Sequence, residues 1–232
     1  MSLVLKNVTK NFGGLRAVGD VSFTVPDKSI FGLIGPNGAG KTTVFNLITG
    51  VYKHDVGSIH FGKTDLLPLK PSQIAGDELS KKSGLFSGLL RTPTHYSEEK
   101  RLTKKAEELL DVFKLKDLKD APSTSLPYGN QRRLEICRAM MLEPKLLLRD
   151  EPAAGMNYGE AEGLKEQIRW LRETFSIAVV LVEHNMQVVM GVCEEIHVLD
   201  HGETIAHGVP SEIKAHPKVI AAYLGEETAE AS

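Results

Sequence analysis

One stretch near the N-terminus constrains this chain most: an apolar run, a glycine-rich turn and a helix follow one another. Ile30–Ile34 is typical of a short buried strand, and Lys41–Thr49 is predicted to be a helix. The turn between them matches G-x-x-x-x-G-K-[ST]. Glycines let backbone N–H groups turn inward around a phosphate, and a helix N-terminus favours an anion. We interpret the turn as a phosphate-binding loop rather than a turn without function. Its residues are Gly35, Pro36, Asn37, Gly38, Ala39, Gly40, Lys41 and Thr42.

Two side chains of this loop have predicted roles. The pattern places the Lys41 ammonium at the β- and γ-phosphates of a nucleotide, and it offers the Thr42 hydroxyl to Mg²⁺. The sequence therefore predicts a Mg·ATP site that extends from Gly35 to Thr43.

Two adjacent acids follow a second apolar run. Leu146–Leu148 is typical of a buried strand, and the C-terminal ends of parallel strands line the ligand crevice of an α/β sheet. Asp150 is expected to hold Mg²⁺, directly or through water, and Glu151 to polarise the attacking water. The alternative is a solvated acid pair that caps the next segment. The phosphate-binding loop favours the catalytic interpretation.

A histidine follows a third apolar run. His184 comes shortly after the predicted strand Ala178–Val182, where it can contact a γ-phosphate or the attacking water and assist Glu151. By itself such a histidine is more often an ordinary loop residue. The other seven histidines show no metal-ligand spacing, so no role is assigned to them.

The order of elements predicts the fold class. Strands alternate with helices, which indicates an α/β fold with a parallel or mixed sheet and helices on both faces. We expect a nucleotide-binding core over residues 1–70 and 143–225 and a helical subdomain over residues 71–142. The acidic stretch 226–232 is expected to be disordered.

Composition excludes some partners and compartments. The net charge of −2 gives no electrostatic reason to expect nucleic acid. The N-terminal residues carry no signal-peptide pattern, and the late apolar run Ile177–Val182 is too short to cross a bilayer. Cys137 and Cys193 are expected to be buried thiols in a reducing compartment. A membrane role must therefore come through a partner.

The phosphate-binding loop, the Asp150–Glu151 pair and His184 together resemble the nucleotide-binding domains of ABC transporters, a resemblance that covers nearly the whole chain. It implies a P-loop NTPase with an ABC-type core. Phe12 matches the aromatic residue that stacks on adenine. The segment that matches the family signature implies a helix facing the γ-phosphate of a second subunit, where Gly129 lets the backbone approach an anion. The signature residues are Leu126, Pro127, Tyr128, Gly129 and Asn130, and the loop crossing between subunits is Gly155, Met156 and Asn157.

Within that family, four stretches resemble one of the two ATPases of branched-chain amino acid importers; lipid-handling ABC ATPases share some of them. The resemblance implies ATP and Mg²⁺ as cofactors, and a dimer with itself or a second ABC ATPase subunit. It also implies transmembrane permease subunits, an indirect periplasmic or extracellular substrate-binding protein, and a peripheral position on the cytoplasmic face of the membrane. The stretches are Phe12–Val18, Tyr128–Arg133, Glu151–Asn157 and Ile220–Gly225.

Three departures from the family pattern bear on activity. The importer pattern stops at Ala75 and resumes at Gly84, without the family's Q-loop. Either the chain is longer than printed, which we favour and which predicts a mass several kilodaltons above 25.4 kDa, or it has lost a strand. Asn130 replaces a glutamine. Arg149 occupies a normally apolar position, where strand alternation puts it on the side of Glu151 unless it snorkels to solvent.

These departures keep alternatives open. One is a degenerate ABC ATPase that binds ATP and turns it over weakly. Another is a non-transport ABC ATPase, but the coiled-coil insertions of repair ATPases and the paired ATPase domains of translation factors are both missing from this sequence. An assay of phosphate release separates a weak ATPase from a working one.

Overall fold

A computed structural model describes residues 1–74 and 93–230, with the backbone alone for 93–98, 128 and 224–230. The chain divides into two units, one of residues 1–74 with 145–232 and the other of residues 75–144. The sequence placed these boundaries at 70 and 143. The gap expected between Ala75 and Gly84 lies outside the described residues. Among the helices that are described, none has the length and apolar character to span a bilayer.

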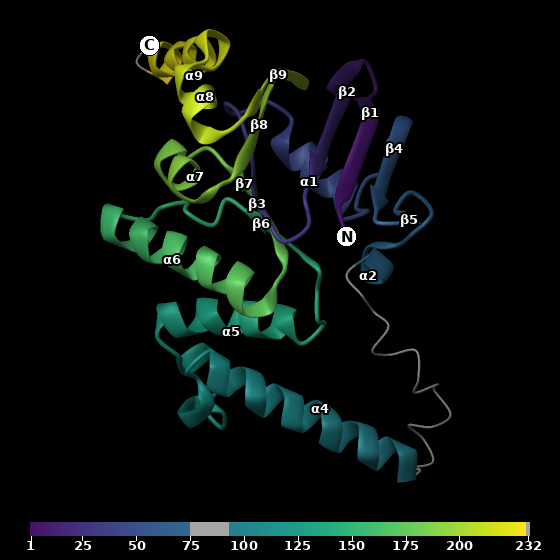
Figure 1. Ribbon diagram of the computed structural model, residues 1–232, viewed down its shortest axis with the longest axis vertical. Helices are drawn as coiled ribbons and strands as arrows, with labels where there is room; N and C mark the ends of the chain where they lie inside the picture. The colour runs from purple at the N-terminus through teal and green to yellow at the C-terminus, as the bar shows by residue number, and fades with distance from the viewer. Residues whose placement is uncertain (75–92, 231–232) are drawn as a thin grey trace. The chain divides into compact units, whose positions relative to one another are not determined.

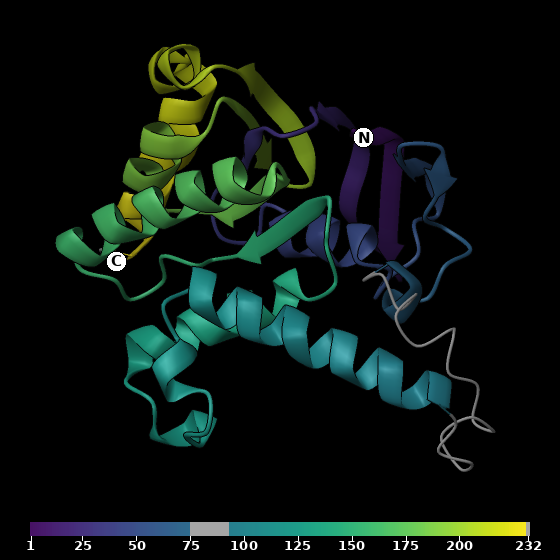
Figure 2. The ribbon, with the colours of Figure 1, turned by 60° about the horizontal axis from the view of Figure 1, so that its bottom comes forward.

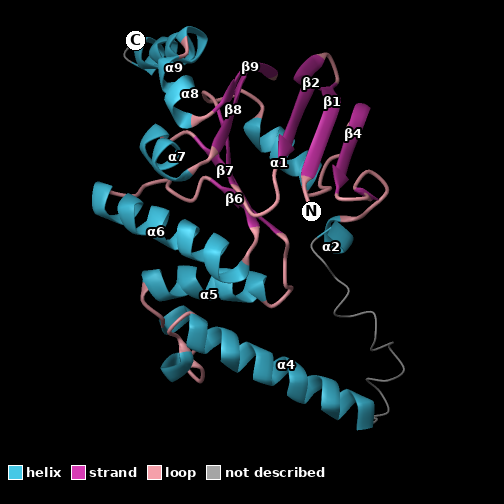
Figure 3. Ribbon diagram, viewed as in Figure 1, coloured by secondary structure: helices cyan, strands magenta, loops and turns pink. Residues whose placement is uncertain are grey.

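The first unit contains a five-stranded mixed sheet, in the order β6-β7-β3-β8-β9. Its strands are drawn as arrows in Figure 1 and in magenta in Figure 3. The first four strands are parallel, and β8 and β9 form an antiparallel hairpin. Strands β3 and β7 are buried along their whole length, which explains why they read as continuous apolar runs. The bounds are β3 Ile30–Ile34, β6 Leu146–Asp150, β7 Ala178–Glu183, β8 Glu195–Asp200 and β9 Glu203–Gly208.

A second, antiparallel sheet of the same unit has the order β2-β1-β4-β5. Alternate residues of β2 are buried, namely Val21, Phe23 and Val25, as their spacing predicts. The strands β4 and β5 were not predicted from the sequence. The bounds are β1 Leu3–Phe12, β2 Leu15–Val25, β4 Val56–Phe61 and β5 Thr64–Asp65.

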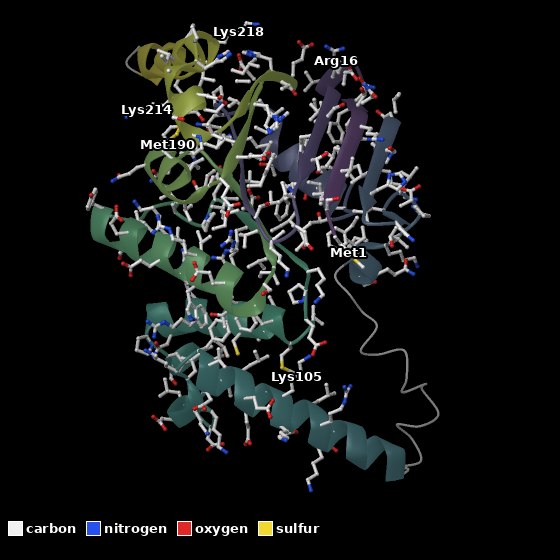
Figure 4. The ribbon with its side chains drawn as sticks, in the orientation of Figure 1. Met1, Arg16, Lys105, Met190, Lys214 and Lys218 are labelled. Carbon is white, nitrogen blue, oxygen red and sulfur yellow. The ribbon has the colours of Figure 1, made fainter. Side chains whose placement is uncertain are left out.

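Helix α1 (Lys41–Ile48) packs its apolar side chains against both sheets. Val44, Leu47 and Ile48 share one core with Leu5 of β1 and Val180 of β7. The short helix α2 (Pro71–Ile74) belongs to the same unit rather than to the helical one. Arg16 (Figure 4), beyond the turn that joins β1 and β2, forms an ion pair with Glu203 of β9 and so ties the two sheets together.

Helices α6 (Tyr158–Phe175) and α7 (Met186–Val192) lie on the other side of the parallel sheet from α1 (Figures 1 and 2). The apolar stripe of α6 is buried. After β9 come α8 (Pro210–Ala215) and α9 (Pro217–Glu230). The expectation of a disordered tail is therefore corrected over 226–230, where alanine and glutamates favour a helix. The stripe consists of Ala161, Leu164, Ile168 and Leu171.

The second unit is helical in its described part, as the sequence predicts. Its long helix α4 (Pro93–Val112) is joined to α5 (Tyr128–Met140) by two short 3₁₀ turns, Lys116–Leu118 and Ser123–Ser125. Lys105 of α4 (Figure 4) donates to the carbonyl of Met141 and pairs with Glu143 at 2.6 Å. These contacts hold α4 against the C-terminal end of α5.

Candidate active site

The phosphate-binding loop joins β3 to α1, and its backbone needs glycine at two positions. Gly35 and Gly40 have φ angles of 153° and 97°. A Cβ on Gly35 would lie 2.1 Å from the carbonyl oxygen of Leu199, and one on Gly40 would lie 2.6 Å from that of Ala17. Both conformation and space therefore exclude a side chain. The shape of the loop therefore depends on glycine at both positions and on the close approach of the Leu199 and Ala17 backbones.

The charge of Lys41 is enclosed by the loop. The side chain is 5% exposed, and Nζ donates to the carbonyls of Gly35 at 2.7 Å and Pro36 at 2.9 Å. A buried ammonium needs such acceptors. Asn37, Gly38 and Thr42 are exposed, Gly40 and Thr43 are half-buried, and Gly35, Pro36 and Ala39 are buried.

The acid pair stands beside the same loop. Asp150 ends β6, and burial raises the pKa of its carboxyl, with Glu151 adding to the rise and Lys41 opposing it. Glu151 has left the strand, with φ at 44°, a conformation that non-glycine residues adopt rarely and that clusters at functional sites. Its N–H still donates to Val182 O at 2.8 Å, which fixes the turn against β7.

The structure brings Glu151 and His184 together. The Oε1 of Glu151 lies 3.4 Å from Nδ1 of His184, and both side chains remain accessible, at 40% and 47%. They meet because β6 and β7 are adjacent parallel strands that end in register, with Asp150 opposite Val182. Strand alternation predicted that Arg149 and Glu151 share a side. Glu151 lies beyond the strand, because β6 ends at Asp150, so alternation does not apply to it.

Glu183 is a polar residue at this corner that the sequence analysis missed. It ends β7, it is 0% exposed, and it accepts hydrogen bonds from three backbone N–H groups. The signal available in the sequence was an acid directly after an unbroken apolar run, next to a histidine.

Phe12, the aromatic residue expected to stack on adenine, is held in position by two side chains that the sequence did not predict as its neighbours. Phe12 ends β1 and is 42% exposed. The ring of Tyr52 meets it edge-on at 5.1 Å, and the Lys10 ammonium lies over it at 5.4 Å. Asp55 holds Lys10 at 2.9 Å, so the ring sits in a small fixed cluster.

The signature segment lies at the start of α5. Leu126 is buried, Pro127 is exposed at the N-cap, and Asn130 is half-buried; the side chain of Tyr128 lies outside the described part. A Cβ built on the exposed Gly129 meets nothing within 4 Å. Gly129 is therefore not required by the packing of its own unit.

The crossing loop has a structural role within the first unit. Gly155 adopts a φ of 73°, and Met156 N donates to Ala153 O at 3.1 Å. The side chain of Asn157 accepts from Glu160 N while the Glu160 carboxylate accepts from Asn157 N, which makes a capping box for α6.

Comparison with known proteins identifies relatives over the whole chain. Residues 18–154 match the family model described as ABC transporter, and residues 203–229 match one described as branched-chain amino acid ATP-binding cassette transporter. The high-affinity branched-chain amino acid transport ATP-binding protein LivG of Salmonella typhimurium is 39% identical, over 97% of this chain and 98% of its own. The Escherichia coli lipopolysaccharide export system ATP-binding protein LptB is 37% identical, with the same coverage.

A solved structure has the same fold. The ATP-binding cassette MJ1267 of an ABC transporter, in its ADP conformation, superposes with a TM-score of 0.82 at 28% identity, over 97% of this chain and 99% of its own. A nucleotide-free ATP-binding cassette from an ABC transporter gives a TM-score of 0.79 at 28% identity, over 96% and 99%.

The alignment with LivG also shows an internal difference in length. It spans 249 positions, whereas 97% of 232 residues is about 225, so about 24 positions of the relative have no counterpart here.

Proposed function

This chain belongs to the ABC transporter family of ATP-binding subunits, and from that membership we propose that it powers the import of branched-chain amino acids by hydrolysing ATP. One observation carries the ATPase site: the phosphate-binding loop, the acid pair and His184 follow β3, β6 and β7, which are neighbours in one parallel sheet. The match of residues 203–229 to the branched-chain family favours the amino acid substrate.

The loop and Lys41 bind the phosphates of ATP. The inward N–H groups and the N-terminus of α1 attract anionic oxygens, and the ammonium neutralises charge that grows in the transition state. Phe12, held by Tyr52 and Lys10, offers a ring face to the adenine base.

The donor set beside the phosphates fits Mg²⁺. The Thr42 hydroxyl and the Asp150 carboxylate are hard oxygen ligands, and a cation favours the ionised form of a carboxyl whose pKa burial has raised. When bound, Mg²⁺ supplies positive charge to the phosphate oxygens. Thr42 and Asp150 are the residues of this chain that would hold it.

Glu151 is the general base in this proposal. Its accessible carboxylate polarises the attacking water, while its contact with Nδ1 of His184 orients the imidazole and leaves Nε2 for the γ-phosphate side. The left-handed backbone at Glu151 directs the carboxylate toward that histidine instead of along the strand.

The remaining components act in an assembly. Gly129 and the rest of the signature face the γ-phosphate held by a second ATPase subunit, identical or similar, and the loop Gly155–Asn157 crosses between them. Transmembrane permease subunits receive the motion on the cytoplasmic face of the membrane, and a substrate-binding protein acts through them. Because Gly129 is exposed and a Cβ there would meet nothing, its backbone can approach the nucleotide bound by the second subunit.

A lipid-handling ATPase is the second candidate, because the identity to LptB is nearly as high as to LivG. Transport in vesicles decides between them. The chain with its permeases should drive uptake of leucine that depends on ATP; extrusion of lipopolysaccharide without leucine uptake would favour the second candidate.

The ATPase site is tested by two variants and one control. Lys41→Ala should lose Mg·ATP binding, and Glu151→Gln should keep binding, lose phosphate release and accumulate an ATP-bound dimer. Lys53→Ala removes an exposed lysine of the same unit and should behave as wild type. Unchanged ATP affinity in Lys41→Ala, or near-normal turnover in Glu151→Gln, contradicts the assignment.

A further inference from the structure

A buried acid joins the two turns that carry Glu151 and His184. Glu183 is one of five polar or charged residues that are buried in the described residues, and its exposure is 0%. Burying a carboxylate is costly unless its oxygens are hydrogen-bonded. The carboxylate of Glu183 accepts hydrogen bonds from backbone N–H groups, so the positions of these groups indicate its structural role.

The two carboxylate oxygens reach in different directions. Oε1 accepts from Ala153 N at 2.7 Å, across 30 positions of sequence. Oε2 accepts from His184 N at 3.2 Å and Asn185 N at 3.3 Å, in the turn that follows β7. One side chain therefore links the turn after β6 to the turn after β7.

The link extends the strand pairing where the backbone can no longer continue it. The β6–β7 ladder ends with Glu151 N donating to Val182 O. Beyond this point Glu151 turns into the left-handed region, and the Glu183 carboxylate supplies the next acceptor, for Ala153. Glu183 therefore holds Ala153, two positions after Glu151, against the turn that carries His184.

The same link reaches the crossing loop. The carbonyl of Ala153 accepts from Met156 N at 3.1 Å, and the Glu151 carbonyl accepts from Ala154 N at 3.1 Å. Consecutive hydrogen bonds therefore join the His184 turn, Glu183, Ala153 and Met156.

The carboxylate sits in an apolar setting. Burial raises the pKa of the nearby Cys193 thiol to about 12, and the charge of Glu183 adds to the rise. Hydrogen bonds between a charged acceptor and buried donors are strong and leave little room for displacement.

We propose that Glu183 is a positioning residue that holds the Glu151 turn, the His184 turn and the crossing loop in the relation that ATP hydrolysis requires. The inference rests on the proposed ATPase function. Glu183 touches neither ATP nor water in this account; it acts through the backbone of Ala153, His184 and Asn185.

The test uses the full chain with Glu183→Gln, which keeps the volume, and Glu183→Asp, which keeps the charge but withdraws it by one methylene. The matched control is Val179→Ala, fully buried at the other end of β7. Displacing catalytic groups by a fraction of an ångström should lower kcat about tenfold or more in both Glu183 variants, with the Kd for Mg·ATP within about threefold of wild type. Val179→Ala should keep kcat within about twofold below its melting temperature.

Amide hydrogen exchange provides the second readout. Ala153 and Met156 should lose protection in both Glu183 variants and keep it in Val179→Ala. A normal kcat in Glu183→Gln overturns the inference alone, and an equal loss of ATP affinity and kcat overturns it in favour of a purely structural role. A wild-type chain without phosphate release overturns the proposed function, and this inference with it.

Discussion

Helices α1 and α5 both begin at a glycine-containing motif, but the glycines have different structural reasons at the two sites. At the start of α1, Gly35 and Gly40 have positive φ angles and no room for a Cβ. At the start of α5, Gly129 is exposed and a Cβ there meets nothing within 4 Å. The first motif is therefore required by its own fold, whereas the fold places no such requirement on Gly129, which we propose acts on a partner subunit. Their substitutions should separate stability from turnover.

Gly35→Ala should have the largest effect on stability. The added methyl would meet the Leu199 carbonyl at 2.1 Å in a backbone region that disfavours side chains, so we expect a loss of about 3 kcal/mol or more in the free energy of unfolding. Urea denaturation measures it, with Gly163→Ala on the exposed face of α6 as control. A loss under about 1 kcal/mol would contradict the account.

Acid should destabilise the unit that holds the phosphate-binding loop. His197 of β8 is buried, and burial, followed by the charge of His207, lowers its pKa from 6.5 to about 4. The unfolded chain therefore binds the extra proton between these values, so stability is complete above pH 6.5 and falls as the pH drops toward 4.

The largest loss from His197 is on the order of 3 kcal/mol. His197 packs on Phe23 at 4.8 Å and its Nε2 bonds Thr204 at 2.9 Å, and His207, itself 3.3 Å from Glu195, faces it. His197→Gln should flatten the pH dependence of unfolding over this window. A slope equal to wild type would show that other groups cause it.

Asn157→Ala should have an intermediate effect. Removing the capping box of α6 should cost about 1 kcal/mol, because Glu160 N loses its acceptor. Tyr158→Ala, an exposed neighbour, is the control. If Asn157 also acts across a subunit interface, turnover should fall more than this loss of stability explains.

Gly129→Asp should have the smallest effect on stability, within about 0.5 kcal/mol, because the position is open. It should nevertheless lower ATP hydrolysis strongly, since a carboxylate would oppose the γ-phosphate of the partner site. Binding of ATP to the monomer should remain intact. A large drop in the melting temperature, or loss of ATP binding, would show that this glycine serves its own unit.

The elements that the sequence predicted are those with a strong local pattern. The apolar runs predicted strands β3, β6 and β7 to within two residues of their observed bounds. The strands β4 and β5 were not predicted, because apolar and polar residues alternate only weakly over Val56–Phe61 and its pairing with β1 is long-range. The acidic stretch 226–230, which the sequence predicted to be a disordered tail, lies in helix α9, because alanine and glutamate have high helix propensity.

The sequence by itself located the phosphate-binding loop, because its glycine pattern lies between an apolar strand and the start of a helix, which is a local signal. It also placed acids and a histidine after apolar strands. Only the tertiary structure decided that Glu151 lies 3.4 Å from His184, that Tyr52 braces Phe12 and that Glu183 joins two turns 30 positions apart. Those contacts depend on which strands are neighbours and on where each backbone leaves the sheet, and no local pattern of residues encodes either.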